Sequence, residues 1–245
     1  MNVLEVQGLT KHYPAFTLNG VSFAVSEGAV MGFIGRNGAG KSTTLKSILG
    51  MVHPDAGEVK VFGMDYAANE RAIRRELGVV LGVIDFYHKK KILVITDVTR
   101  RFYDNWDEDK YRHYLRLFAI DEEKRVDQLS SGMKVKYMIA IALSHNARLL
   151  ILDEPTSGLD PVSRDELTEL LRRLVADGTR SVLFSTHITS DLEKCATHIA
   201  FIKDGELQYT GSLDDFRTHY KDVGATLEDI IVHVERRPLD EGAII

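Results

Sequence analysis

Residues 35–42 read Gly-Arg-Asn-Gly-Ala-Gly-Lys-Ser, which is the spacing G-x-x-x-x-G-K-[ST] of a phosphate-binding loop. Its glycines let successive backbone N–H groups turn toward one anion, where a Cβ atom would obstruct them. An apolar run at 30–34 predicts a buried strand before the loop, and 42–49 predicts a helix after it, ended by Gly50. A helix N-terminus favours the same anion. This order predicts an α/β fold with a nucleotide site.

Two side chains of this loop have an expected partner at that site. Lys41 is predicted to reach the β- and γ-phosphates, and the Ser42 hydroxyl is predicted to ligate Mg²⁺. The alternative, an ordinary glycine-rich turn, explains neither the spacing nor the strand and helix on either side. The loop residues expected to contact the nucleotide are Gly35, Asn37, Gly38, Ala39, Gly40, Lys41, Ser42 and Thr43.

The composition is that of an ordinary globular protein. The chain has 245 residues, 44% of them hydrophobic, which suits one large α/β domain or two small ones. No apolar run approaches the length that spans a bilayer, and residues 1–6 lack the pattern of a signal peptide. The single Cys195 excludes an internal disulfide and is expected to be buried on a helix. With 31 basic and 36 acidic residues, no nucleic-acid partner is expected.

Strands and helices alternate along much of the chain, which predicts a parallel-rich sheet covered on both faces. Two predicted strands at 199–202 and 207–210 are joined by Asp204 and Gly205, a residue pair typical of tight hairpin turns. Short apolar runs predict further strands at 58–62, 77–81, 149–152 and 182–185.

Residues 84–146 differ in character from the regions on either side. Apolar and aromatic residues recur there at helical spacing, which predicts a helical insertion between two core strands. The aromatic residues are expected to form a small core of their own, with a contact role for Trp106 as the alternative. They are Phe102, Tyr103, Trp106, Tyr111, Tyr114 and Phe118.

Candidate catalytic residues follow two of the predicted strands. Ligands gather at the carboxyl ends of parallel strands, so Asp153 and Glu154 are expected beside the phosphate loop. Asp153 is predicted to hold Mg²⁺ through water, and Glu154 to act as the general base toward the attacking water. His187 follows the strand at 182–185 and is predicted to bond the γ-phosphate and hold that water.

A second anion site is predicted where a helix begins after Leu129. Ser130 is a good N-cap, and a helix N-terminus that begins with Ser131 and Gly132 suits a phosphate. The loop around Lys41 needs no second anion site in the same chain. The presence of a second anion site therefore predicts that this site serves a nucleotide on a partner subunit.

Taken together, these residues resemble the ATP-binding subunit of an ABC transporter over essentially the whole chain. The resemblance adds two expected contacts to ATP, from Tyr13, which would stack on adenine, and from Asp160. A phosphate loop alone fits many NTPases, but five motifs in one family's order are very specific. The two Walker motifs are matched by residues 35–42 and 149–154, and the signature motif by 129–133. The D-loop is matched by residues 157–160 and the switch histidine by residue 187.

The resemblance implies a fold and a domain organisation. The fold is an α/β P-loop NTPase core of the RecA type, with an N-terminal antiparallel β subdomain and an inserted α-helical subdomain. Residues 1–245 would form one ATP-binding domain. Its core would lie at about 1–83 and 147–211, its helical subdomain at about 84–146, and a C-terminal extension at 212–245.

The resemblance also implies partners. In a head-to-tail dimer with an identical or different ATP-binding subunit, Ser130 and Gly132 of one subunit close on ATP held by Lys41 of the other. A transmembrane permease is the second partner, which places the chain at the cytoplasmic face of the cell membrane. ATP hydrolysis would then power export. The segment 86–107 resembles a subgroup that exports peptides, antibiotics or amphipathic toxins.

The sequence departs from the family pattern in two places. The signature motif has Ser131 for Gly and Met133 for Gln, although Ser131 keeps the backbone N–H that meets phosphate. The family usually has a Gln soon after the strand at 77–81, touching Mg²⁺ and the permease. This chain has Gly82-Val83-Ile84 there, and Asp85 is about three residues out of register.

The permease contact is expected within residues 82–104, where residues 92–95 form an apolar stretch. Their β-branched residues favour a strand, but the family register places a helix there, and we follow the family because tertiary packing often overrides propensity. An exposed apolar patch beside the lysines at 89–91 is the predicted docking surface. The alternative is burial of these residues in the helical insertion.

Two other functions remain open from the sequence. A regulatory cassette that binds ATP and hydrolyses it poorly is favoured by the missing Gln and opposed by Glu154 and His187. A soluble mechanical ATPase of the same fold, acting on ribosomes or DNA, usually carries two cassettes or a long coiled-coil insertion. Neither feature is present in this sequence.

Overall fold

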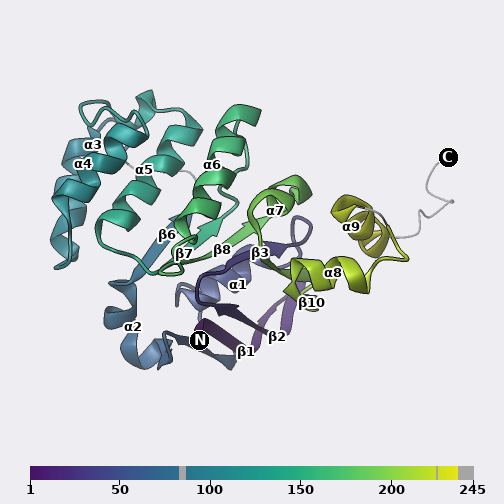
Figure 1. Ribbon diagram of the computed structural model, residues 1–245. Coiled ribbons are helices and arrows are strands. Elements are labelled where there is room, and N and C mark those ends of the chain that lie inside the picture. Colours follow the sequence, from purple (N-terminus) through teal and green to yellow (C-terminus); the bar gives the residue numbers. More distant parts are fainter. Residues whose placement is uncertain (83–86, 225, 237–245) are drawn as a thin grey trace.

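The structure, a computed structural model, describes residues 1–82, 87–224 and 226–236. Figure 1 shows sheets with helices packed around them and a separate group of helices at one end. The described strands are β1 (Asn2–Tyr13), β2 (Phe16–Ser26), β3 (Val30–Ile34), β4 (Ala56–Val61), β5 (Met64–Asp65), β6 (Leu77–Leu81), β7 (Leu149–Asp153), β8 (Ser181–Thr186), β9 (His198–Lys203) and β10 (Glu206–Ser212). The described helices are α1 (Lys41–Ile48), α2 (Tyr66–Arg74), α3 (Ile92–Thr99), α4 (Glu108–Leu117), α5 (Ser131–Ser144), α6 (Pro161–Leu174), α7 (Thr189–Cys195), α8 (Leu213–His219) and α9 (Leu227–Glu235), with 3-10 turns at Arg100–Phe102 and Val126–Gln128.

The N-terminal strands form an antiparallel sheet in the order β2-β1-β4-β5. β1 pairs with β2 on one side and β4 on the other, and its apolar side chains are buried against the rest of the core. The strand predicted at 58–62 begins earlier, at Ala56, and ends before Phe62, whose φ of +53° does not fit a strand. The antiparallel β subdomain is confirmed.

The second sheet carries the predicted parallel core. Its strand order is β10-β9-β3-β8-β7-β6, with parallel pairing from β9 through to β6 and an antiparallel β10 at the edge. Every residue of β3 and β8 is buried, as expected for central strands covered by helices on both faces. Because β3, β8 and β7 are parallel neighbours, the loops after them meet at one edge of the sheet.

The helices α3, α4 and α5 lie together beyond the β6 edge (Figure 1). Residues 92–95 are helical, so the family register was right and the local strand propensity was overridden. The reason is tertiary: Ile92 is fully buried, and the Thr96 hydroxyl lies 2.9 and 2.8 Å from the hydroxyls of Tyr111 and Tyr137. The buried core of this group consists of Ile92, Tyr111, Leu115, Ile120, Val126, Leu129 and Tyr137.

The aromatic residues of this region do not all join that core. Trp106 packs against it beside Tyr111, with ring centroids 5.3 Å apart, so packing is the correct interpretation. Phe102 is exposed, and its assignment to the core was wrong. Tyr103 instead stacks on His145 at a centroid distance of 3.8 Å, in contact with the end of α5. Aromatic spacing alone does not separate these environments.

The β9–β10 hairpin turns at Asp204 and Gly205, as the sequence predicts. Gly205 has φ of +86°, and a Cβ atom there would lie 1.9 Å from the Thr17 carbonyl oxygen. Its N–H donates to the Ala39 carbonyl at 3.0 Å, and its carbonyl accepts from Asn19 N–H at 2.9 Å. The turn therefore fastens the phosphate loop to β2.

Candidate active site

The predicted phosphate lysine, general base and histidine meet at the carboxyl edge of the parallel sheet. Lys41 begins α1 after β3, Glu154 follows β7, and His187 follows β8. The Lys41 Nζ lies 3.1 Å from Glu154 Oε1, and His187 Nδ1 lies 2.8 Å from Glu154 Oε2. Three segments far apart in the sequence thus form one polar cluster.

The phosphate loop has the geometry of an anion cradle. Gly38 and Gly40 have φ of +84° and +112°, and a Cβ atom on Gly40 would lie 2.9 Å from the Phe16 ring. Gly40 is the N-cap of α1, and within the described chain no side chain caps that helix. Its first N–H groups are left for a ligand. The Lys41 ammonium folds back over the loop and donates to the Gly35 carbonyl at 2.7 Å.

Asp153 and Glu154 are held by one hydroxyl that the sequence analysis missed. Ser185 is fully buried and lies opposite Asp153 in the β7–β8 register. Its Oγ donates to Asp153 Oδ1 at 2.5 Å and accepts the Glu154 N–H at 2.9 Å. Glu154 has φ of +49°, an uncommon conformation for a residue other than glycine. Finding Ser185 requires the strand register, which no local pattern indicates.

The predicted metal ligands fit the chemistry of Mg²⁺. Ser42 and Asp153 are both partly exposed and offer a hydroxyl and a carboxylate oxygen. Oxygen is the ligand atom that Mg²⁺ prefers, with water and nucleotide phosphate completing its shell. These two residues are therefore suited to hold the ion beside a bound triphosphate.

Tyr13 lies at the end of β1, close to the phosphate loop. It pairs across the hairpin with Phe16, the residue that packs against Gly40. Asp55 holds the two residues before Tyr13 in place. Its carboxylate accepts hydrogen bonds from Lys11 Nζ at 2.8 Å and from the backbone N–H of His12 at 2.7 Å. The hydrogen bond from Lys11 keeps the pKa of Asp55 well below its usual range. Tyr13 is exposed at the end of this strand.

The signature and D-loop residues lie together at a separate place. Ser130 caps α5 by accepting a backbone N–H at 3.2 Å, and Asp160 caps α6 by accepting two at 3.0 Å. Hydrogen bonding to Ser163 lowers the pKa of Asp160. A Cβ atom on Gly132 would lie 3.2 Å from Ser163 Oγ, so the two helix N-termini are in contact. Among the contacts of the described residues, none joins Ser130 or Gly132 to Lys41.

The place of the missing Gln is described only in part. Gly82 has φ of +68°, and its N–H approaches the Asp153 carbonyl at 3.4 Å. Residues 83–85, including Asp85, lie outside the described residues. The backbone at Gly82 thus lies beside the end of β7, next to the cluster around Glu154.

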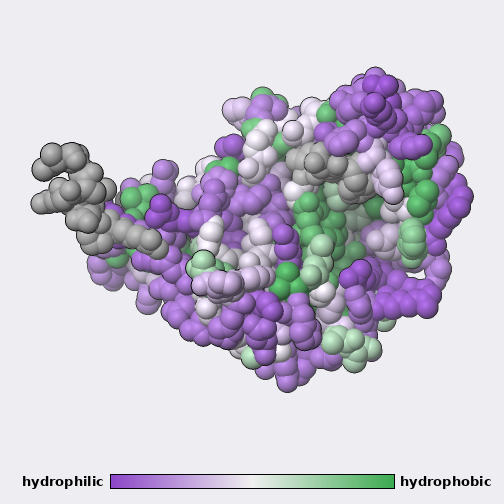
Figure 2. Space-filling view, turned by 180° about the vertical axis from the view of Figure 1, so that it is seen from behind, coloured by the Kyte–Doolittle hydropathy of each residue, from purple (hydrophilic) through white to green (hydrophobic). Residues whose placement is uncertain are grey.

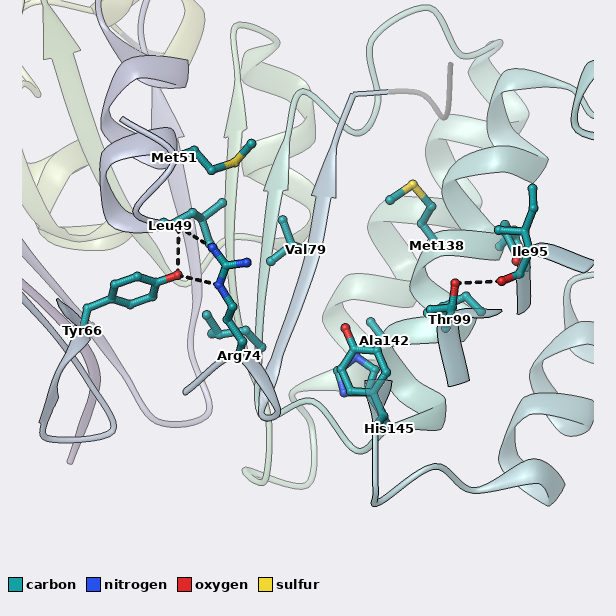
Figure 3. A pocket seen from close by; sticks show the side chains of 14 residues that line it. Leu49, Met51, Tyr66, Arg74, Val79, Ile95, Thr99, Met138, Ala142 and His145 are labelled. Carbon is teal, nitrogen blue, oxygen red and sulfur yellow. Dashed lines mark hydrogen bonds between the residues drawn. The ribbon is translucent and has the colours of Figure 1, made fainter. Parts of the chain in front are cut away.

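A groove of about 450 Å³ separates the helical group from the sheet. Figure 3 shows Leu49, Met51, Tyr66 and Arg74 on one side and Ile95, Thr99, Met138 and His145 on the other, with Val79 of β6 between them. From the corresponding side of the molecule, Figure 2 shows a hollow in which hydrophobic side chains gather. This groove was not predicted from the sequence.

The stretch predicted as a docking patch is partly exposed. Ile92 is fully buried in the core of the helical group and Ile95 is half-buried and lines the groove, whereas Val94 is 45% exposed. Docking at this stretch stays a prediction. Exposed apolar side chains lie one helical face away, at Val94, Val98 and Phe102. Val94 and Val98 lie one turn apart on α3, the helix whose Ile95 and Thr99 line the groove, and Phe102 lies in the 3-10 turn that follows; these three residues form the exposed stripe. None of the described helices has the length and apolar character needed to cross a membrane.

Comparisons with known proteins agree with this site. Residues 18–157 match the model of the ABC transporter family. The chain is 32% identical over 208 residues to the bacitracin transport ATP-binding protein BcrA of Bacillus licheniformis, covering 84% of this chain and 68% of that protein. It is 37% identical over 210 residues to the Nod factor export ATP-binding protein I of Rhizobium meliloti (strain 1021), covering 82% of this chain and 62% of that protein.

Solved structures give the same result. The ATP-binding subunit of an ABC transporter superposes with a TM-score of 0.84 at 30% identity, over 96% of this chain and 100% of that chain. Three observations indicate the same family. They are the five sequence motifs, the position of the phosphate loop beside Glu154 and His187, and these similarities to known proteins. The chain belongs to the ABC transporter family, as an ATP-binding subunit and ATPase of that family.

Proposed function

We propose that this ATPase powers export through a separate membrane permease, with Lys41, Glu154 and His187 as its reaction centre. The observation that carries the proposal is the contact of Glu154 with both of the others, at 3.1 and 2.8 Å. A carboxylate between the phosphate lysine and a histidine, at the carboxyl edge of a parallel sheet, is where a general base toward phosphate is needed.

Nucleotide binding is the first step. The N–H groups of residues 35–43 and the Lys41 ammonium surround the phosphates, and Tyr13 stacks on adenine. Ser42 and Asp153 would hold Mg²⁺, and the ion would neutralise phosphate charge there. Ser185 fixes the Asp153 carboxylate through its 2.5 Å hydrogen bond, so this oxygen ligand is already oriented.

Hydrolysis follows from the position of Glu154. Its carboxylate accepts a proton as a water oxygen attacks the γ-phosphorus, and the bond to the bridging oxygen breaks, so ADP leaves with that electron pair. His187 bonds Glu154 through Nδ1 and is available to orient the water and the γ-phosphate. Lys41 meets the charge that develops on the phosphate oxygens.

A second ATP-binding subunit completes the site in this proposal. Ser130, Ser131 and Gly132 lie at the N-terminus of α5, and Asp160 caps the neighbouring α6. These groups are in contact with each other and are apart from the Lys41 cluster, which supports a head-to-tail dimer in which they face the partner's ATP. We also propose that residues 1–245 form one such ATP-binding domain, with its helical subdomain at about 84–146.

The permease is proposed to dock a short helix in the groove. The apolar lining of the groove and the exposed stripe of Val94, Val98 and Phe102 suit the apolar face of an amphipathic helix. Docking would hold the chain at the cytoplasmic face of the membrane. The named roles of relatives in bacitracin transport and Nod factor export support export here, with peptides, antibiotics or amphipathic toxins as the proposed cargo.

Turnover measurements test this function. ATP hydrolysis is measured for the purified chain alone and after addition of vesicles containing the permease from the neighbouring gene. We expect low turnover alone and a clear rise with the permease. Full turnover alone, with no change on addition, would contradict powering of that permease. Absence of turnover in both conditions would favour a regulatory cassette.

A further inference from the structure

The contact between Glu154 and His187 needs support from elsewhere. The two residues come from different loops, and their side chains are 22% and 41% exposed. A pair this open to water contributes little by itself to holding two loops together. Their 2.8 Å separation must therefore be fixed by groups beneath them.

One such group is a buried hydrogen bond between residues that follow each loop. Thr156, two residues after Glu154, donates its hydroxyl proton to Asp191 Oδ2 at 2.6 Å. Asp191 lies in α7, four residues after His187, and both partners of this bond are fully buried. With Ser185 on the other side of His187, the histidine loop is tied to the Glu154 segment both before and after His187.

Helix capping does not explain the burial of this carboxylate. The N-cap of α7 is Ile188, and no described side chain caps that helix. The Asp191 side chain instead turns inward to Thr156, and its Oδ1 makes no hydrogen bond with any described residue. Burial raises the pKa of Asp191 above its usual value. A buried carboxyl with one oxygen left without a hydrogen bond is costly for stability, which points to a role for Asp191 other than stabilising the fold.

We propose that Asp191 is a positioning residue for ATP hydrolysis, which acts through Thr156 to hold the His187 loop against Glu154. This inference rests on the proposed roles of Glu154 and His187. If the Thr156–Asp191 bond is lost, the two loops separate and the histidine no longer stays at 2.8 Å from the base. Nucleotide affinity, which depends on the phosphate loop, is unaffected.

The test separates positioning from plain stability. Thr156→Val removes the donor at similar volume, and Thr156→Ser restores it. Thr168→Val is the matched control, because Thr168 is also buried and its hydroxyl donates only to the Asp165 carbonyl within α6, at 2.9 Å. For each variant, kcat and KM for ATP are measured together with the melting temperature.

We expect Thr156→Val to lower kcat at least tenfold with KM within twofold, and Thr156→Ser to recover most of the loss. Asp191→Ala should match Thr156→Val, and the double variant should be no worse than either, because both break one bond. Thr168→Val should lower the melting temperature with kcat unchanged.

Two results would overturn the inference, and they differ from failure of the proposed function. Thr156→Val with normal kcat in folded protein makes the bond structural only. If Thr156→Val does not fold, Asp191→Asn is measured instead, because its amide oxygen still accepts the hydrogen bond from Thr156. We expect this variant to keep kcat within threefold. A larger loss of kcat at full stability would show that Asp191 does not act through Thr156. Normal hydrolysis by Glu154→Gln would instead reject the proposed base.

Discussion

The Lys41 ammonium lies 3.1 Å from Oε1 of Glu154, so the group proposed to hold phosphate also faces the group proposed to activate water. The lysine is almost fully buried, and this Glu154 oxygen makes no hydrogen bond with any described residue. The contact is therefore mainly electrostatic. An incoming phosphate must compete with Glu154 for the lysine, and success in that competition frees Oε1 of Glu154 while Oε2 keeps its 2.8 Å contact with His187.

The first prediction concerns nucleotide affinity. Lys41→Ala removes the positive charge that faces the β- and γ-phosphates, so ATP affinity should fall more than tenfold, or about 1.4 kcal/mol. Isothermal titration calorimetry measures this directly. Lys46→Ala, at an exposed position on the same helix, is the control and should bind as the unchanged chain does. Equal affinities for both variants would remove Lys41 from the site.

The second prediction concerns Glu154. Glu154→Gln keeps the shape of the side chain but cannot accept a proton, so hydrolysis should fall by roughly 10² or more. ADP affinity should rise, because the neutral amide competes less for Lys41. Light scattering with ATP and Mg²⁺ should detect a dimer. Glu228→Gln on α9 is the control, and a strictly monomeric Glu154→Gln would contradict the ATP-sandwiched dimer.

The third prediction concerns docking. Val98→Glu places a charge on the exposed stripe beside the groove, so stimulation of ATPase activity by the permease should be abolished while ATP binding persists. Val232→Glu on α9 is a matched control, since the two valines are 53% and 56% exposed. Stimulation is measured with permease-containing vesicles. Equal stimulation of both variants would show that the partner does not cover α3.

The fourth prediction concerns pH. Burial lowers the pKa of His145 to about 4 in the folded chain, against 6.5 for an ordinary histidine. The unfolded chain binds the extra proton first, so this part of the stability is present above pH 6.5 and is lost as pH falls toward 4, by up to about 3 kcal/mol. Urea unfolding at pH 7.5 and 5 should show a smaller pH effect for His145→Gln. The exposed His233→Gln should keep the full effect.

Local patterns predicted the features that depend on neighbouring residues. Three features require only a few adjacent residues, and each has the predicted structure. They are the strand before residue 35, the helix cap at Ser130 and the Asp204-Gly205 turn. The helix at 92–95 was different, because its β-branched residues favour a strand. Only knowledge of the family register gave the correct result there.

Features that depend on distant residues escaped the sequence analysis. Ser185 reaches Asp153 only because β7 and β8 pair in one register, and Asp191 reaches Thr156 across two loops. The exposure of Phe102 depends on which face of the helical group is covered, and an aromatic residue at helical spacing carries no information on that. The groove is likewise a product of how two groups of helices and strands pack.

The attachment of Gly205 to Ala39 and to β2 has a consequence for the order of synthesis. Residue 39 leaves the ribosome long before residue 205, yet the phosphate loop gains its hydrogen bond to the hairpin only when both are present. A nascent chain that already contains the complete loop sequence therefore lacks this brace until more than 160 further residues have been added. Binding of nucleotide by the finished loop should thus be a late event of folding, reached after both sheets have closed on each other.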